Sequence, residues 1–181
     1  MNQKQSTLVN RLDGLNFEIE RSIQYCDYRL FFWQVLSKTA QLLEAVTSSA
    51  AFFLLFRKGT ISAHIFIAIT AFISILAVIL GASQKANDNM KKMMAFNKLS
   101  IKIPDNYDEV TEEQYKNWRN ERKEIDNDGS THIPCLSVIC HNDICLREGI
   151  NDIHPLTSFE KNVGKYLPFP YRSRRESKDI G

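Results

Sequence analysis

Three cysteines and a histidine near the C-terminal end are the residues whose types most directly suggest chemistry. Cys135, Cys140, Cys145 and His141 offer thiol and imidazole groups, which bind zinc and serve as nucleophile and base in thiol enzymes. If these cysteines lie on one helix, however, each points about 140° away from the one before it. They therefore cannot converge on one metal ion, and the sequence predicts reduced, buried, structural cysteines and no metal site.

No other arrangement in the chain carries catalysis. The sequence has no CxxC pair, no glycine-rich phosphate loop, no HExxH and no GxSxG motif, and each of these is a requirement of a particular chemistry. The net charge of +2 gives no reason to expect nucleic-acid binding. We expect a protein that is not an enzyme, has no catalytic residues and needs no cofactor.

A polar stripe lies within the first of two apolar stretches. Lys38, Gln41, Glu44 and Ser48 recur at helical spacing, and polar groups of this kind are costly to place against lipid. One interpretation is that Gln41, Glu44 and Ser48 line a pore, with Glu44 forming a ring of charge in an oligomer. The other is that they make hydrogen bonds between helices, with Glu44 close to the membrane surface. The sequence leaves both interpretations open.

The second apolar stretch carries a stripe of small residues. Thr70, Ser74, Ala77 and Gly81 fall on one helical face. In a bilayer, small side chains let helix backbones approach closely and so mark packing surfaces. We expect this face to pack within one hairpin or between subunits.

The elements that carry these stripes are two apolar segments, residues 39–56 and 60–83. Between Thr39 and Ser83 the only charged residues are Glu44, Arg57 and Lys58. Each segment is long enough, at about 1.5 Å per residue, to approach or exceed the roughly 30 Å of a hydrocarbon core. The alternative is a pair of core helices in a soluble bundle, which rarely run so far without a charge. The sequence predicts an all-α membrane protein with a transmembrane hairpin.

Basic residues set the expected orientation of this hairpin. The short turn holds Arg57 and Lys58, whereas more basic residues flank the outer ends of the two spans, namely Arg29, Lys38, Lys85, Lys91, Lys92 and Lys98. Because basic residues are retained in the cytoplasm, we expect a two-span membrane protein with both termini cytoplasmic.

The remaining segments are predicted to form helices on the cytoplasmic side. Residues 1–38 carry an apolar stripe from Leu8 to Trp33 that needs partner helices. Residues 84–150 should continue the second span as a helix to about Leu99 and then form helices over 112–126 and 134–148. A capping box begins the first of these, and Pro134 begins the second. Residues 151–181 show no period and are expected to be mostly irregular.

The final predicted helix carries a short motif that resembles a known family. Cys140, His141, Asn142 and Asp143 follow Pro134, and this run after an acidic, aromatic helix is similar to the C-terminal signature of SLATT proteins. In that family a Cys-His-Asn run precedes an acidic residue, and Asp143 stands at its position here. The resemblance covers roughly residues 15 to 150, and it assigns these four residues to the motif without giving them a catalytic role.

SLATT proteins are two-span effectors associated with nucleotide-signalling defence systems. The resemblance implies a homo-oligomer that opens a pore in the inner membrane during phage infection and so causes abortive infection. It also implies a sensor or nucleotide-signalling partner encoded nearby. The alternative function is a membrane-anchored interaction or scaffold protein without pore activity, since the hairpin and the amphipathic helix would serve either purpose.

Overall fold

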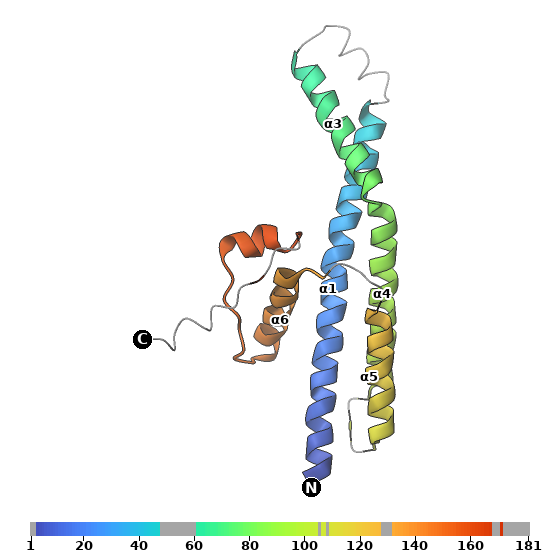
Figure 1. Ribbon diagram of the computed structural model, residues 1–181, viewed down its shortest axis with the longest axis vertical. Coiled ribbons are helices and arrows are strands. Elements are labelled where there is room, and N and C mark those ends of the chain that lie inside the picture. The colour runs from blue at the N-terminus through green and yellow to red at the C-terminus, as the bar shows by residue number, and fades with distance from the viewer. Residues whose placement is uncertain are drawn as a thin grey trace, which may run out of the picture. The chain divides into compact units, whose positions relative to one another are not determined.

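The computed structural model describes residues 3–47, 61–104, 106–107, 109–127, 132–167 and 171. Within these residues the chain is helical and contains no strand, which confirms the expected all-α class (Figure 1). The helices are α1 (Gln3–Thr47), α3 (Ile61–Ile79), α4 (Ala82–Lys102), α5 (Glu112–Asp126), α6 (Pro134–Glu148) and a short π-helix η1 (Glu160–Gly164).

The chain divides into two compact units. One, the bundle unit, comprises Met1–Asp27 and Lys91–Gly181, and the other, the hairpin unit, comprises Tyr28–Met90. Both α1 and α4 contribute one part to each unit. Along the chain, the boundaries between the units therefore fall within α1 and α4.

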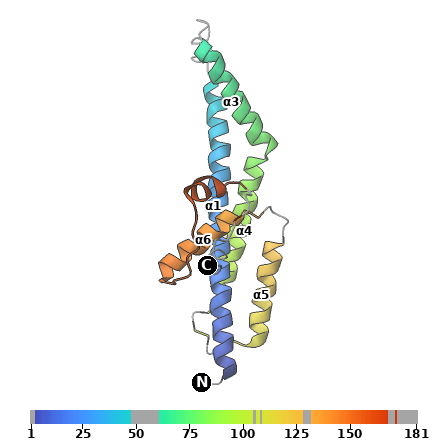
Figure 2. The same cartoon turned by 60° about the vertical axis from the view of Figure 1, so that its left-hand side comes forward.

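The core of the bundle unit forms around the apolar stripe of α1. Leu12 and Ile19 of α1 are fully buried with Phe96 and Leu99 of α4, and Tyr115 of α5 closes the same cluster. Figures 1 and 2 show α6 on the opposite side of α1 from α4 and α5. The expectation that the stripe packs against the later helices is confirmed within this unit.

Helices α5 and α6 have the bounds that the sequence predicted, because their ends are specified locally. The side-chain oxygen of Thr111 accepts a hydrogen bond from the Gln114 amide at 3.3 Å, and the Gln114 side chain accepts one from the Thr111 amide at 2.8 Å. This capping box satisfies backbone groups that would otherwise lack partners. Pro134 occupies the first turn of α6, and Gly149 ends that helix in the left-handed conformation with φ 69°.

In the hairpin unit, the expectation of one continuous helix from the second apolar segment to Leu99 is wrong. Helix α3 ends at Ile79, Gly81 takes a positive φ of 61°, and α4 begins at Ala82. A positive φ ends the regular hydrogen-bond ladder, and the Gly81 amide instead donates to the Val78 carbonyl three residues back. The helical segments Ala68–Ile79 and Ala82–Lys102 are bent by 46° relative to each other at this break.

The break affects how the second span is interpreted. In the described part of the chain, no helix taken singly combines the length and the apolar composition needed to cross a membrane; the bent pair of α3 and α4 meets both criteria only when combined. Helix α1 extends through the first half of segment 39–56 to Thr47. The rest of that segment and the turn at residues 57–59 lie outside the described residues.

Small side chains pack the helices of the hairpin unit together. Ala40 of α1, Ala77 of α3 and Ala82 of α4 form a buried cluster, with Trp33 and Leu36 of α1 packed against it. Alanine lets helices approach closely, because little side-chain volume separates their backbones.

Part of the C-terminal segment, expected to be mostly irregular, packs on α6. Residues 158–167 include the π-helix η1, and Gly164 lies so close to α6 that a Cβ atom there would be 3.0 Å from the Cys135 sulfur. A side chain at position 164 would require the Cys135 side chain to shift by a few tenths of an ångström, and no local sequence pattern reveals this close approach.

The core contact of Leu12 gives a test of the bundle unit. Leu12→Ala should lower the free energy of unfolding by about 2–5 kcal/mol, because it leaves a cavity in a fully buried site. Leu146→Ala on the exposed face of α6 is the matched control and should change it little. Urea unfolding of the full chain, followed by Trp118 fluorescence, measures both; equal effects of the two variants would contradict this core.

Candidate functional site

The polar stripe of α1 borders a groove within the hairpin unit. The groove has a volume of about 390 Å³ and is lined from α1 by Ser37, Ala40, Gln41 and Glu44. Its other wall is the junction of α3 and α4, and the residues there are Ala77, Val78, Gly81, Ser83 and Gln84. The structure thus places two of the candidate pore residues, Gln41 and Glu44, on one groove. The third, Ser48, lies outside the described residues.

The four small residues of α3 and the junction differ in burial. Thr70 and Ala77 are buried and Ser74 is partly buried, whereas Gly81 forms the break between α3 and α4. The hydroxyl oxygen of Ser74 is buried and has no hydrogen-bond partner among the residues that the structure describes. Ala77 joins the cluster that holds α1, α3 and α4 together, so at least this part of the stripe packs within one hairpin.

Large apolar side chains are exposed on α1 and α3 of the hairpin unit. On α3, Phe72 is 66% exposed and Val78 is 75% exposed. Other large apolar side chains exposed on the two helices are Ile65, Ile69, Ile75 and Ile79 of α3 and Phe31, Val35, Leu42 and Val46 of α1. Exposed apolar side chains in such number are typical of a region that contacts a membrane or another protein.

The motif residues of α6 lie in the bundle unit and fix its packing. Cys140 is fully buried in a cluster with Leu136, against which Tyr25 of α1 packs. The Asp143 carboxylate accepts a hydrogen bond from the Gln24 side chain at 3.1 Å. These contacts join α6 to α1, which agrees with the structural role expected of the motif.

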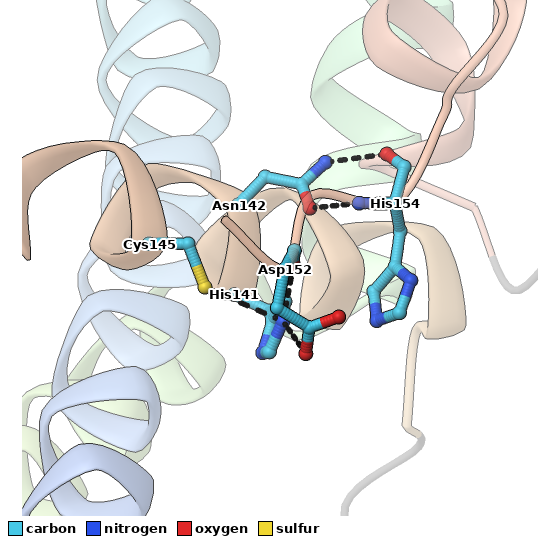
Figure 3. A network of polar contacts seen from close by, with 5 residues as sticks. All are labelled: His141, Asn142, Cys145, Asp152 and His154. Carbon is cyan, nitrogen blue, oxygen red and sulfur yellow. Dashed lines mark hydrogen bonds and ion pairs between the residues drawn. The ribbon is translucent and has the colours of Figure 1, made fainter. Parts of the chain in front are cut away.

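Asn142 attaches the chain that follows α6 back onto the helix. Its side-chain amide donates to the His154 carbonyl at 2.7 Å, and its side-chain oxygen accepts from the His154 amide at 2.8 Å (Figure 3). Both backbone groups of His154 are thereby satisfied by one side chain, which is nearly buried.

His141 stands at the centre of a second set of contacts (Figure 3). Its Nε2 atom lies 3.0 Å from the Asp152 carbonyl oxygen, 3.4 Å from the Asp152 carboxylate and 3.5 Å from the Cys145 sulfur. The His141 ring stacks on the His154 ring, with their centroids 4.9 Å apart. The Phe17 ring meets the His141 ring edge-on, with a centroid distance of 5.3 Å. One ligand atom from each of His141, Asp152 and His154 lies within 4.8 Å of the other two.

Sequence reasoning paired His141 with the cysteines and missed Asp152 and His154. These two residues lie two apart in a non-helical segment, and alternate residues of extended chain point to the same side. The D-x-H spacing just after a helix-ending glycine was the only available signal. It became informative once the segment was seen to fold back on α6.

All four cysteines are buried and none forms a disulfide, which confirms the burial expected for Cys135, Cys140 and Cys145. Burial raises the pKa of Cys140 to about 12, with the Asp143 carboxylate adding to the effect. Burial also raises the pKa of Cys135 and of Cys145. Because the thiolate is the reactive form, none of these thiols is set up as a nucleophile.

No protein-family model matches this chain, and no curated protein and no solved structure shows significant similarity to it. Membership of the SLATT family therefore stays a prediction drawn from the motif and the arrangement of helices.

The raised pKa of Cys140 predicts its reactivity. At pH 8 the thiol in the folded protein should stay protonated and resist alkylation by iodoacetamide, whereas urea should make it reactive. Because folding raises the pKa of Cys140, the protonated thiol favours the folded state below its unfolded pKa of 9.0. This contribution to the free energy of unfolding is lost as pH rises toward about 12. Mass spectrometry of alkylated peptides gives the measurement, and rapid native labelling of Cys140 would contradict its burial.

Proposed function

We propose that this protein is a membrane effector of a bacterial antiphage defence system. In this proposal the hairpin unit inserts into the inner membrane, with both termini in the cytoplasm, and several copies assemble into a pore. A partner, either a sensor or a nucleotide-signalling enzyme, triggers the opening. The observation that carries the proposal is the combination of an apolar outer surface and a polar groove in the hairpin unit.

The apolar surface supports insertion in lipid. The large side chains exposed on α3 and on the adjoining part of α1 would be costly to hydrate at about 25 cal/mol per Å², and lipid tails would cover them. Helix α3 runs from Ile61 to Ile79 without a charged residue, as the hydrocarbon core requires. The bend at Gly81 separates this apolar helix from the charged α4.

The polar groove supports a conducting assembly. Two helices cannot enclose a water-filled path, so a pore needs several hairpins arranged around an axis. Gln41 and Glu44 are exposed on the wall of the groove, and such groups avoid lipid when they face water or protein. A ring of Glu44 carboxylates would favour cations.

The SLATT resemblance supports the link to defence and to a partner. The bundle unit has its own core, and the motif residues fix α6 and the following segment to α1. A rigid module beside a membrane hairpin suits an effector that receives a signal from another protein. The same features would suit a membrane-anchored scaffold without a pore, and ion flux separates the two functions.

Glu44 gives the functional test. Once opened by its partner, the chain in liposomes should conduct cations in preference to anions, since the proposed ring is negative. Glu44→Gln should conduct with lost cation preference, and Glu44→Lys should reverse the preference or block flux. Glu113→Gln on α5 is the matched control and should leave selectivity unchanged.

Reversal potentials in planar bilayers report the preference. Conductance with unaltered selectivity in both Glu44 variants would remove Glu44 from the pore. If protein that is inserted in the membrane and activated by its partner gives no ion flux, the result favours the scaffold function.

Ala77 gives a separate test of how the hairpin packs. Ala77→Leu should impair assembly, because the larger side chain would force apart the helices that meet at Ala40 and Ala82. Ala71→Leu, at an exposed position of the same helix, makes the same change without this clash. Cross-linking in membranes measures the oligomers, and equal yields from the two variants would count against close packing at Ala77.

A further inference from the structure

The cluster at the C-terminal end of α6 combines groups that bind metal ions. It holds two imidazoles and a carboxylate, contributed by His141, His154 and Asp152. It lies in the bundle unit, far along the chain from the groove residues, and the proposed pore does not use it. Its chemistry is therefore independent of the proposed function.

Backbone geometry brings these groups together. The left-handed Gly149 ends α6, with the amides of Gly149 and Ile150 both donating to the Cys145 carbonyl. The chain then reverses along the helix, and the two hydrogen bonds from Asn142 fix the backbone of His154. Asp152 and His154 thereby face His141, as Figure 3 shows.

The separations approach those of a tetrahedral metal site. In such a site zinc lies about 2.0–2.3 Å from nitrogen, oxygen or sulfur ligands, so neighbouring ligand atoms are roughly 3.3–3.6 Å apart. His141 Nε2 is 3.4 Å from the Asp152 carboxylate. The ligand atoms of His141, Asp152 and His154 all lie within 4.8 Å of one another.

We propose that His141, Asp152 and His154 bind a zinc ion as its three protein ligands. Imidazole favours zinc over magnesium or calcium, which prefer oxygen ligands. The three residues are partly buried.

An ion pair between His141 and Asp152 accounts for only part of this arrangement. It does not involve the His154 ring, which stacks on the His141 ring with their centroids 4.9 Å apart. A metal ion would be bound by both imidazoles, and the carboxylate would balance part of its charge.

A zinc ion here would join α6 to the segment that follows it. That segment leads into η1, which packs on Cys135 at Gly164. Metal binding would therefore stabilise the C-terminal part of the bundle unit, because binding energy at a site formed only on folding adds to the stability of the fold.

The test uses the full chain without a histidine tag, purified in detergent and dialysed against buffer with micromolar free zinc. Elemental analysis should find one zinc per chain. Asp152→Asn and His154→Ala should each weaken zinc binding at least about tenfold, as loss of even a supporting residue does in known sites. His132→Ala, whose ring stacks on Tyr25 outside the cluster, is the control and should retain the metal.

Cobalt substitution tests the site in the wild-type chain and does not depend on any variant folding. The wild-type chain with cobalt should show the strong visible absorption of a tetrahedral site. Absence of zinc from the wild type, or equal zinc in the Asp152 and His154 variants, would overturn the site.

Discussion

The structure depends on covering one apolar stripe along a helix that runs from Gln3 to Thr47. A helix this long with a continuous apolar face gains stability only where other elements remove that face from water. In the bundle unit, Phe96 and Leu99 of α4 and Tyr115 of α5 cover one side of α1, and α6 covers another. In the hairpin unit, alanines replace these large side chains. The same helix thus has two modes of packing, each suited to its unit.

The change of packing mode coincides with a change in what lies on the outer surface. The bundle unit carries ion pairs at its surface, such as Arg11 with Glu112 at 2.7 Å and Arg122 with Glu18 at 2.9 Å. The outer face of the hairpin unit instead exposes large apolar side chains. Exposed ion pairs add little stability, but charged side chains of this kind are well hydrated and favour contact of the bundle unit's surface with water. We propose that this division corresponds to the membrane boundary, with Gly81 ending the apolar helix α3.

At the end of α6, a residue that fixes the packing of the chain also brings metal-binding side chains together. Asn142 is placed to satisfy the backbone of His154, and in doing so it brings Asp152 and His154 to His141. The residues that resemble the SLATT motif therefore act on the segment after the helix as well as on α1. The zinc proposal follows from this geometry and stands apart from any pore.

The sequence alone determined the features that depend on neighbouring residues. Thr111, Gln114, Pro134 and Gly149 specify the ends of α5 and α6 through local hydrogen bonds and backbone preferences, so these bounds were predicted correctly. The apolar period of α1 predicted its buried face for the same reason. Only the tertiary structure revealed the break at Gly81, since glycine is compatible both with a continuous helix and with the positive φ that interrupts one. Only the tertiary structure brought His141 to Asp152 and His154, because that contact depends on a chain reversal fixed by Asn142, and helical spacing carries no information about it.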